Sequence, residues 1–195
     1  MAVQRIKTEN RTSERILDIA ERLVQTRGFN SFSYADIANE LGITTASLHY
    51  HFRGKAELGQ ALITRYTERF RGALGRIDSE VPDPPAKLEA YAGLYADVLA
   101  GKRMCMCGVL AAEYQTLPKP MRRAVTSFFD ENQRWLVGVL TNGRTDKTLA
   151  FTGPPDEVAQ TIISTLEGAM LVTRPYGDLT RFNSTAHQLL ASLTS

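Results

Sequence analysis

Residues 42–55, GITTASLHYHFRGK, concentrate uncharged hydrogen-bonding side chains in one short stretch. Leu48 and Phe52 recur there at a helical spacing of four. Around them stand short hydroxyls, two imidazoles and a phenol, at Thr44, Thr45, Ser47, His49, Tyr50 and His51. A helix face that meets only water is usually richer in Glu and Lys. This helix is therefore a candidate surface for a polar partner.

Cys105 and Cys107 are the second group of residues that could take part in chemistry, and they are the only cysteines of the chain. A structural zinc site requires four ligands, and no nearby His adds to the two cysteines. Neither a metal nor a cofactor is therefore expected. Lys102 and Arg103 favour a thiolate, as would a helix starting near Cys107, and these features suggest an oxidant sensor. The alternative is buried packing, because a free cysteine behaves as a small hydrophobe. Both interpretations stay open.

The positions of the histidines argue against an enzyme. The three histidines are His49, His51 and His187, and the first two lie in the polar helix. A cysteine nucleophile needs a histidine base, and only the distant His187 is left for that role. The chain has no Ser-His-Asp order, phosphate-binding glycine loop or HExxH pattern. We therefore expect a binding protein.

Composition and charge limit which class of protein this chain can be. The chain has 195 residues, 43% of them hydrophobic, enough for one or two domains with a sizeable core. Its net charge is +2, but residues 1–76 carry 12 Lys and Arg against 8 Asp and Glu, so the basic excess lies in the first third. No apolar run reaches the roughly 18–20 residues of a membrane span, and the N-terminus lacks an apolar signal core. We expect a cytoplasmic protein.

The apolar spacing is helical almost throughout and predicts an all-α fold of about nine helices. The first helix is expected to begin at Thr12 or Ser13 and to end at Gly28. A short helix from the cap Ser33 to Gly42, then a third helix capped by Thr44 or Thr45, form a helix-turn-helix. Further helices are predicted from Lys55, and at about 85–100, 107–116, 119–141, 156–173 and 179–193.

The segment SYADIANELGITTASLHYHFRGKAEL, residues 33–58, resembles the DNA-binding signature of the TetR family of transcriptional repressors. The matching positions are Ile37-Ala38, Leu41-Gly42-Ile43, Leu48, Tyr50-His51-Phe52 and Lys55 to Leu58, whereas His49 stands where the family usually has Tyr. The resemblance covers about residues 12–62. It implies an N-terminal DNA-binding domain, residues 1–54, and a C-terminal ligand-binding and dimerisation domain, residues 55–195.

The resemblance also implies which residues meet DNA. The third helix would enter the major groove, with phosphate contacts from the second helix and from the start of the fourth. The expected DNA-binding residues are Ser33, Tyr34, Thr44, Thr45, Ala46, Ser47, His49, Tyr50, His51 and Lys55. Thr44 or Thr45 could equally serve as a cap, and His51 could pack on the first helix. An N-terminal arm with Arg5, Lys7 and Arg11 could add phosphate contacts, or could be disordered.

For the C-terminal domain the resemblance implies a small-molecule pocket and a homodimer interface made by the last two helices. Candidate lining residues are Tyr91, Tyr95, Met104, Met106, Tyr114, Phe128, Trp135 and Met170, with Glu113 or Arg134 as polar partners. The expected function is a repressor that leaves a palindromic double-stranded operator when its ligand binds. The alternative is a redox- or electrophile-sensing repressor that uses Cys105 and Cys107. Whether the regulator represses or activates depends on where the operator lies.

Overall fold

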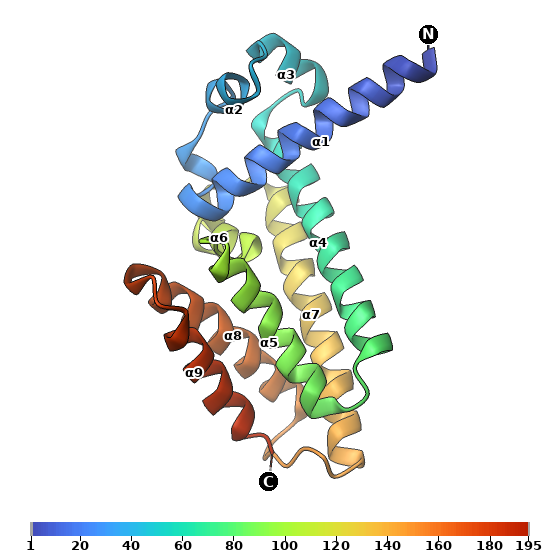
Figure 1. The fold of residues 1–195 in the computed structure, drawn as a ribbon, viewed down its shortest axis with the longest axis vertical. Coiled ribbons are helices and arrows are strands. Elements are labelled where there is room, and N and C mark those ends of the chain that lie inside the picture. The colour runs from blue at the N-terminus through green and yellow to red at the C-terminus, as the bar shows by residue number, and fades with distance from the viewer. Residues whose placement is uncertain (1, 195) are drawn as a thin grey trace. The chain divides into compact units, whose positions relative to one another are not determined.

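The computed structural model describes residues 2–194, and the side chains of residues 11–194. Within this range the chain forms nine α-helices and no strand, which confirms the predicted all-α fold (Figure 1). The helices are α1 (Ala2–Arg27), α2 (Tyr34–Leu41), α3 (Thr45–His51), α4 (Lys55–Glu80), α5 (Pro84–Ala100), α6 (Met106–Ala112), α7 (Lys119–Thr145), α8 (Pro155–Thr173) and α9 (Leu179–Ala191). None of the described helices combines the length and apolar character that a bilayer span requires.

The helices group into two compact units. The head comprises the residues up to 66 together with 106–125, and the sensor unit comprises 67–105 together with the residues from 126 onward. The long helices α4 and α7 each contribute residues to both units. These two names are kept below.

Three helix boundaries differ by about four residues or more from those expected, and one of them is the end of the seventh helix, at Thr145 instead of about 141. The first helix begins at Ala2, not at Thr12 or Ser13, because no Gly or Pro precedes Gly28 and the hydroxyls at 12 and 13 stand inside a continuous helix. The sixth helix ends at Ala112 instead of about 116, and the chain tightens there into a 3₁₀ turn over Tyr114–Thr116. The side chains of Arg5 and Lys7 lie outside the described residues.

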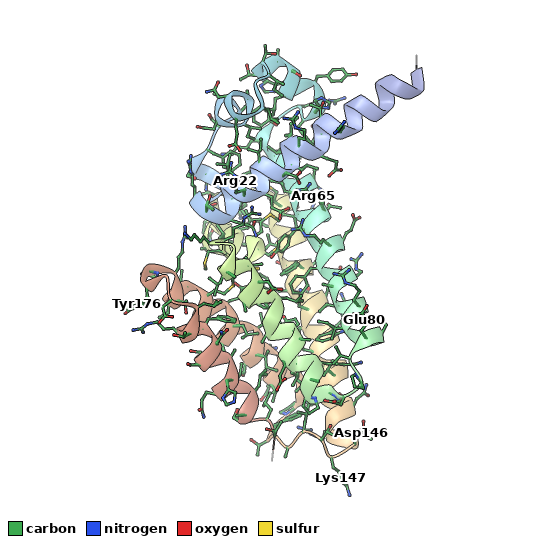
Figure 2. The ribbon with its side chains drawn as sticks, viewed as in Figure 1. Arg22, Arg65, Glu80, Asp146, Lys147 and Tyr176 are labelled. Atoms are coloured by element: carbon green, nitrogen blue, oxygen red, sulfur yellow. The ribbon has the colours of Figure 1, made fainter. Side chains whose placement is uncertain are left out.

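In the head, α1 packs against α2 and α6 through a fully buried face that includes Ile16, Ala20 and Leu23. Polar contacts tie the same helices at the surface. Arg65 of α4 reaches three carboxylates of α1, at 3.1 Å from Glu14, 2.8 Å from Asp18 and 3.0 Å from Glu21. Arg22 of α1 donates to Glu40 of α2 at 2.6 Å (Arg22 and Arg65 are labelled in Figure 2). These contacts fix α1 against α2 and against the start of α4.

In the sensor unit, α8 and α9 lie side by side, and α5 packs against both (Figure 1). The other face of α5 meets α4 and α7 through aromatic rings. Phe70 contacts Tyr91, Tyr95 and Phe128 with ring centroids 6.1, 6.2 and 5.2 Å apart. Trp135 stacks on Tyr91 at 5.5 Å with an interplanar angle of 21°. These rings form an aromatic cluster, in which Tyr91, Tyr95 and Phe128 are buried and Phe70 and Trp135 are half-buried.

Candidate nucleic-acid interface and ligand chamber

The turn between α2 and α3 has the geometry that the sequence predicts. Ser33 caps α2, and Asp36 accepts hydrogen bonds from the Ser33 backbone N–H at 2.7 Å and hydroxyl at 2.6 Å. These bonds hold the pKa of the Asp36 carboxyl below its usual range. Gly42 ends the helix at φ 67°, a left-handed conformation that costs glycine little. The Ile43 N–H then bonds back to the Ala38 carbonyl at 3.0 Å and fixes the reversal.

Helix α3 presents its polar side chains to the outside. Thr44 is the cap, and its hydroxyl accepts from the Ser47 N–H at 3.1 Å. Leu48 is completely buried and anchors the helix in the core. Thr45 and Ala46 are exposed, and the Tyr50 side chain is 69% exposed, a high value for a large aromatic residue. An exposed phenol beside small side chains suits contact with a polar partner.

Tyr34 and His49 are engaged within the head. The Tyr34 hydroxyl donates to the Phe52 carbonyl at 3.0 Å. Burial, reinforced by the Glu57 carboxylate, raises the pKa of Tyr34 to about 12, so the phenol stays protonated. The His49 ring lies 4.7 Å from the Tyr34 ring, and its Nδ1 is 3.2 Å from the Arg53 carbonyl. A carbonyl only accepts, so Nδ1 carries a proton and donates to it.

Lys55, expected at a DNA phosphate, is half-buried at the start of α4. Its ammonium donates to the Phe32 carbonyl and lies 4.8 Å and 4.3 Å from the ring centroids of Phe29 and Phe32. Desolvation lowers the pKa of Lys55, and the Glu113 and Asp36 carboxylates oppose that shift. Lys55 therefore ties the α1–α2 connection to α4, and its phosphate contact stays a prediction, as do the contacts of the other expected DNA-binding residues.

Glu113, which lies more than 80 residues later in the sequence, holds the same connection between α1 and α2. Its carboxylate accepts from the Phe29 N–H at 2.7 Å and from the Asn30 N–H at 3.4 Å, next to Gly28 at φ 94°. A side-chain carbon added at Gly28 would approach a Glu113 oxygen to 2.5 Å, so only glycine fits there. Thr116 adds a hydrogen bond from the Asn30 amide at 2.7 Å. Glu113 is thus a structural residue of the head, and its separation of more than 80 residues from this turn left no local signal in the sequence.

Four of the expected ligand residues meet in the aromatic cluster: Tyr91, Tyr95, Phe128 and Trp135. Phe70 of α4, which was not among the expected ligand residues, completes the cluster. Met104 and Met170 are buried in the same unit, whereas Met106 and Tyr114 belong to the head. The structure therefore divides the expected ligand residues between the sensor unit and the head, and the aromatic cluster contains residues of the sensor unit alone.

A cleft of about 560 Å³ opens beside the aromatic cluster, between the sensor-unit parts of α4 and α7. Phe70, Phe128, Asn132 and Trp135 line it, and Arg134 lies at its edge. Two polar bridges cross between the helices here. Arg71 forms a bidentate pair with Glu131 at 2.8 and 2.9 Å, and the Trp135 indole N–H donates to Asp78 at 2.9 Å. A cleft of this volume with an aromatic lining and few polar groups suits a small organic ligand.

Behind the cleft lies a connected set of buried polar groups. Tyr91 donates to Asn132 Oδ1 at 3.4 Å, and Asn132 donates to the Phe128 carbonyl at 2.7 Å. The Tyr91 and Tyr95 hydroxyls are 3.0 Å apart, and burial raises the pKa of both phenols. Burial also raises the pKa of Glu167 on α8 to about 7, although a hydrogen bond from the Cys105 thiol favours its ionised form. Sequence reasoning missed both Asn132 and Glu167.

Both cysteines are buried, with exposed fractions of 2% for Cys105 and 0% for Cys107. Neither forms a disulfide, and they belong to different compact units, Cys105 to the sensor unit and Cys107 to the head. Among the described residues no group of His, Cys, Asp and Glu is arranged to hold a metal ion. Burial favours the packing interpretation, whereas the Cys105–Glu167 hydrogen bond gives that thiol a polar partner.

The sequence matches two family models, one for each region. Residues 16–62 match the model for bacterial regulatory proteins of the tetR family, and residues 84–189 match the model for the tetracyclin repressor-like C-terminal domain. The chain belongs to the TetR family. TetR regulators bind DNA operators and small-molecule ligands and form dimers, and many are repressors. The family consists of regulatory DNA-binding proteins.

Individual relatives agree with this assignment. A TetR-family regulator from Agrobacterium tumefaciens is 32% identical, superposes with a TM-score of 0.93, and the match covers 96% of this chain and 100% of that one. A TetR regulator from Legionella pneumophila is also 32% identical, with a TM-score of 0.86 over 94% and 97% of the two chains. The transcriptional repressor NemR of Escherichia coli K12 is 26% identical over 182 residues, 84% of each chain.

Proposed function

We propose that this TetR regulator is a repressor whose homodimer binds a palindromic operator and leaves it when a small molecule binds in the C-terminal domain. The protein acts in the cytoplasm, with residues 1–54 as the DNA-binding domain and residues 55–195 as the ligand-binding and dimerisation domain. The observation that carries the proposal is α3, a helix anchored by buried Leu48 whose outer side chains are small, polar and exposed.

The exposed side chains of α3 support base reading. Thr45 and Ala46 are short enough to let the helix approach base edges, and Ala46 can contact a thymine methyl. Tyr50 and His51 follow one turn later, where phosphates and sugars lie. Thr44 performs the capping role and can still offer its hydroxyl proton to DNA, because the cap uses the oxygen as an acceptor.

Exposed apolar residues support dimerisation through α8 and α9. Leu171 and Val172 are 64% and 63% exposed near the end of α8, and Tyr176, in the turn that follows, is 59% exposed (Tyr176 is labelled in Figure 2). Large apolar side chains exposed together mark a surface that a partner covers. A two-fold dimer places two copies of α3 about 34–36 Å apart, so that they read successive turns of a palindrome.

The cleft and the aromatic cluster support ligand control. A ligand shifts the balance between DNA-binding and DNA-free states only by its differential affinity for the two. Helices α4 and α7 both line the cleft and both continue into the head, so a ligand that changes their spacing acts on two continuous helices at once. This connection supplies a physical route for release.

The test is binding of the purified protein to the DNA upstream of its own gene, in reducing buffer at stated salt concentration. Wild type should bind that fragment far more tightly than unrelated DNA, and Tyr50→Ala should weaken the specific complex. If the upstream DNA does not bind, a selection of bound fragments from the genome extends the test. Equal, weak binding to every fragment would overturn the proposal.

A second candidate trigger is oxidation or alkylation of Cys105, with Cys107 as the other thiol. The hydrogen bond from the Cys105 thiol to Glu167 favours it, because a nearby carboxyl can take the proton when the thiol reacts. This trigger predicts operator release by peroxide or an electrophile. It is excluded if a Cys105→Ser, Cys107→Ser double variant responds to those reagents as wild type does.

A further inference from the structure

The buried polar groups of the sensor unit have an uneven supply of hydrogen-bond donors and acceptors. Tyr91 uses its one hydroxyl proton toward Asn132 Oδ1, so Tyr95 donates to Tyr91. The Cys105 thiol proton is used toward Glu167. Each of these three protons therefore has an acceptor among the buried polar groups. The hydrogen-bonding capacity that remains unused consists of oxygen lone pairs.

One of these acceptors stands out. The Glu167 side chain is half-buried as a whole, yet its Oε1 atom is buried and has no hydrogen-bond partner. A buried carboxyl oxygen without a partner is costly, and such atoms are rare in folded proteins. A donor delivered to Oε1 recovers this cost, and the protons of Tyr91, Tyr95 and Cys105 are already engaged elsewhere.

The surroundings of Glu167 select the kind of donor. Tyr91 and Tyr95 face it from α5, and Cys105 faces it from the segment before α6. On α9, which packs against α8, the charged or titratable residues Arg181 and His187 are exposed. A carboxylate among phenol rings stabilises a cation, through the charge and through the faces of the rings. An anionic ligand would meet acceptor oxygens and a like charge.

We propose that the sensor unit recognises an organic amine, with the ammonium on Glu167 Oε1 and its apolar part among the rings of the aromatic cluster. The inference rests on the proposed function and names the ligand class for the same site. The ligand enters by the cleft between α4 and α7, since Phe70 and Trp135 line this cleft and both contact Tyr91. An amine binds the ionised form of Glu167, so binding at low pH displaces a proton from this carboxyl.

Three ligands of one shape test the inference: 3-phenylpropylamine, 3-phenylpropan-1-ol and 3-phenylpropanoate. Calorimetry on the protein alone, with Trp135 fluorescence as a second signal, measures their affinities at several pH values. The amine should bind at least about tenfold more tightly than the alcohol at pH 8, a difference of one charge-assisted bond. Its affinity should fall about tenfold per unit as pH drops below about 7, the pKa of Glu167, while that of the alcohol stays constant.

Two carboxyl variants locate the effect. Glu167→Gln should remove the preference for the amine and its pH dependence, whereas Glu89→Gln, which changes an exposed carboxyl on α5, should keep both. The inference is overturned if the alcohol or the carboxylate binds as tightly as the amine, if Glu167→Gln keeps the preference, or if millimolar amine gives no saturable binding. These measurements contain no DNA, so a protein that binds its operator specifically but ignores amines would lose this inference and keep the proposed function.

Discussion

The head and the sensor unit place their polar side chains in opposite ways. In the head, α3 holds Thr45 and Tyr50 on the outside, around a single buried anchor, Leu48. In the sensor unit, Tyr91, Tyr95 and Asn132 are buried and bonded to one another. Exposed polar groups suit a partner that stays in water, such as duplex DNA, whereas buried ones suit a ligand that must leave water to bind. The same contrast predicts that changes at exposed positions of α3 alter binding more than stability, and that changes among the buried polar groups of the sensor unit alter stability first.

The largest expected effect comes from a charge placed on α3. Ala46→Asp puts a carboxylate on an exposed position that the proposed function places against the DNA, and we expect operator affinity to fall by about 100-fold or more. The free energy of unfolding should change by less than about 0.5 kcal/mol, because the site is exposed. Fluorescence anisotropy and urea unfolding measure the two. Gln115→Glu, an equal charge change elsewhere on the head, is the control and should leave affinity nearly unchanged.

The next effect concerns the buried carboxyl of the sensor unit. The pKa of Glu167 is raised from 4.5 to about 7 on folding, so the folded protein binds more protons between these values. Stability should fall as pH rises through this window, by up to about 3 kcal/mol in total at about 1.4 kcal/mol per unit of pKa. Glu167→Gln should flatten that slope and stabilise the protein at pH 8 but not at pH 4.

Urea unfolding at both pH values tests this prediction, with Glu89→Gln as the exposed control. A variant with the wild-type slope would show that Glu167 is not the group responsible. It would also mean that burial does not destabilise the ionised form of this carboxyl, so the sensor unit would not differ from the head in this respect.

A smaller effect is expected at the clamp on the α1–α2 connection. Glu113→Ala leaves the Phe29 N–H without its acceptor and should cost about 1–2 kcal/mol of stability, since charge-assisted hydrogen bonds are worth about 1.5–3 kcal/mol and this one is only partly buried. Glu113→Gln keeps an acceptor oxygen and should cost less. Thermal unfolding measures both, and Gln115→Ala is the neighbouring control. Equal stabilities of all three variants would contradict the structural role of Glu113.

The smallest effect separates the two threonines at the start of α3. Thr44→Ala removes the cap that accepts from the Ser47 N–H and should cost about 1 kcal/mol. Thr45→Ala removes an exposed hydroxyl and should change stability by less than about 0.5 kcal/mol while weakening operator binding. Chemical unfolding and DNA titration of the two variants sharpen the comparison, and a stability loss confined to Thr45→Ala would reverse the assignment.

The helix-turn-helix was predictable because its signals are local. Ser33, Gly42 and Thr44 act on residues within a few positions of themselves, so their roles follow from spacing alone. Glu113 and Glu167 act on residues far away in the sequence, and nothing near them indicates the partner. The start of the first helix was wrong for a related reason: Thr12 and Ser13 can cap a helix, but the preceding residues continue it.

Of the expected ligand residues, six are buried and Tyr114 is 37% exposed, and the sequence could not tell which helix faces which. Tyr91, Tyr95, Phe128 and Trp135 meet in one cluster because α5 crosses both α4 and α7. Met106 and Tyr114 fall in the head because the chain returns there between residues 106 and 125. Only the three-dimensional fold separates these groups.

The most direct test of the account is a base-resolved footprint of the wild-type protein on its selected operator fragment. A dimer that reads DNA with two copies of α3 should protect two half-sites related by a two-fold axis, with major-groove centres about 10–10.5 base pairs apart or a multiple of that spacing. Ala46→Asp should lose both half-sites together. A single unsymmetrical site, or uniform protection along the fragment, would contradict the central claim that this chain is a dimeric reader of a palindromic operator.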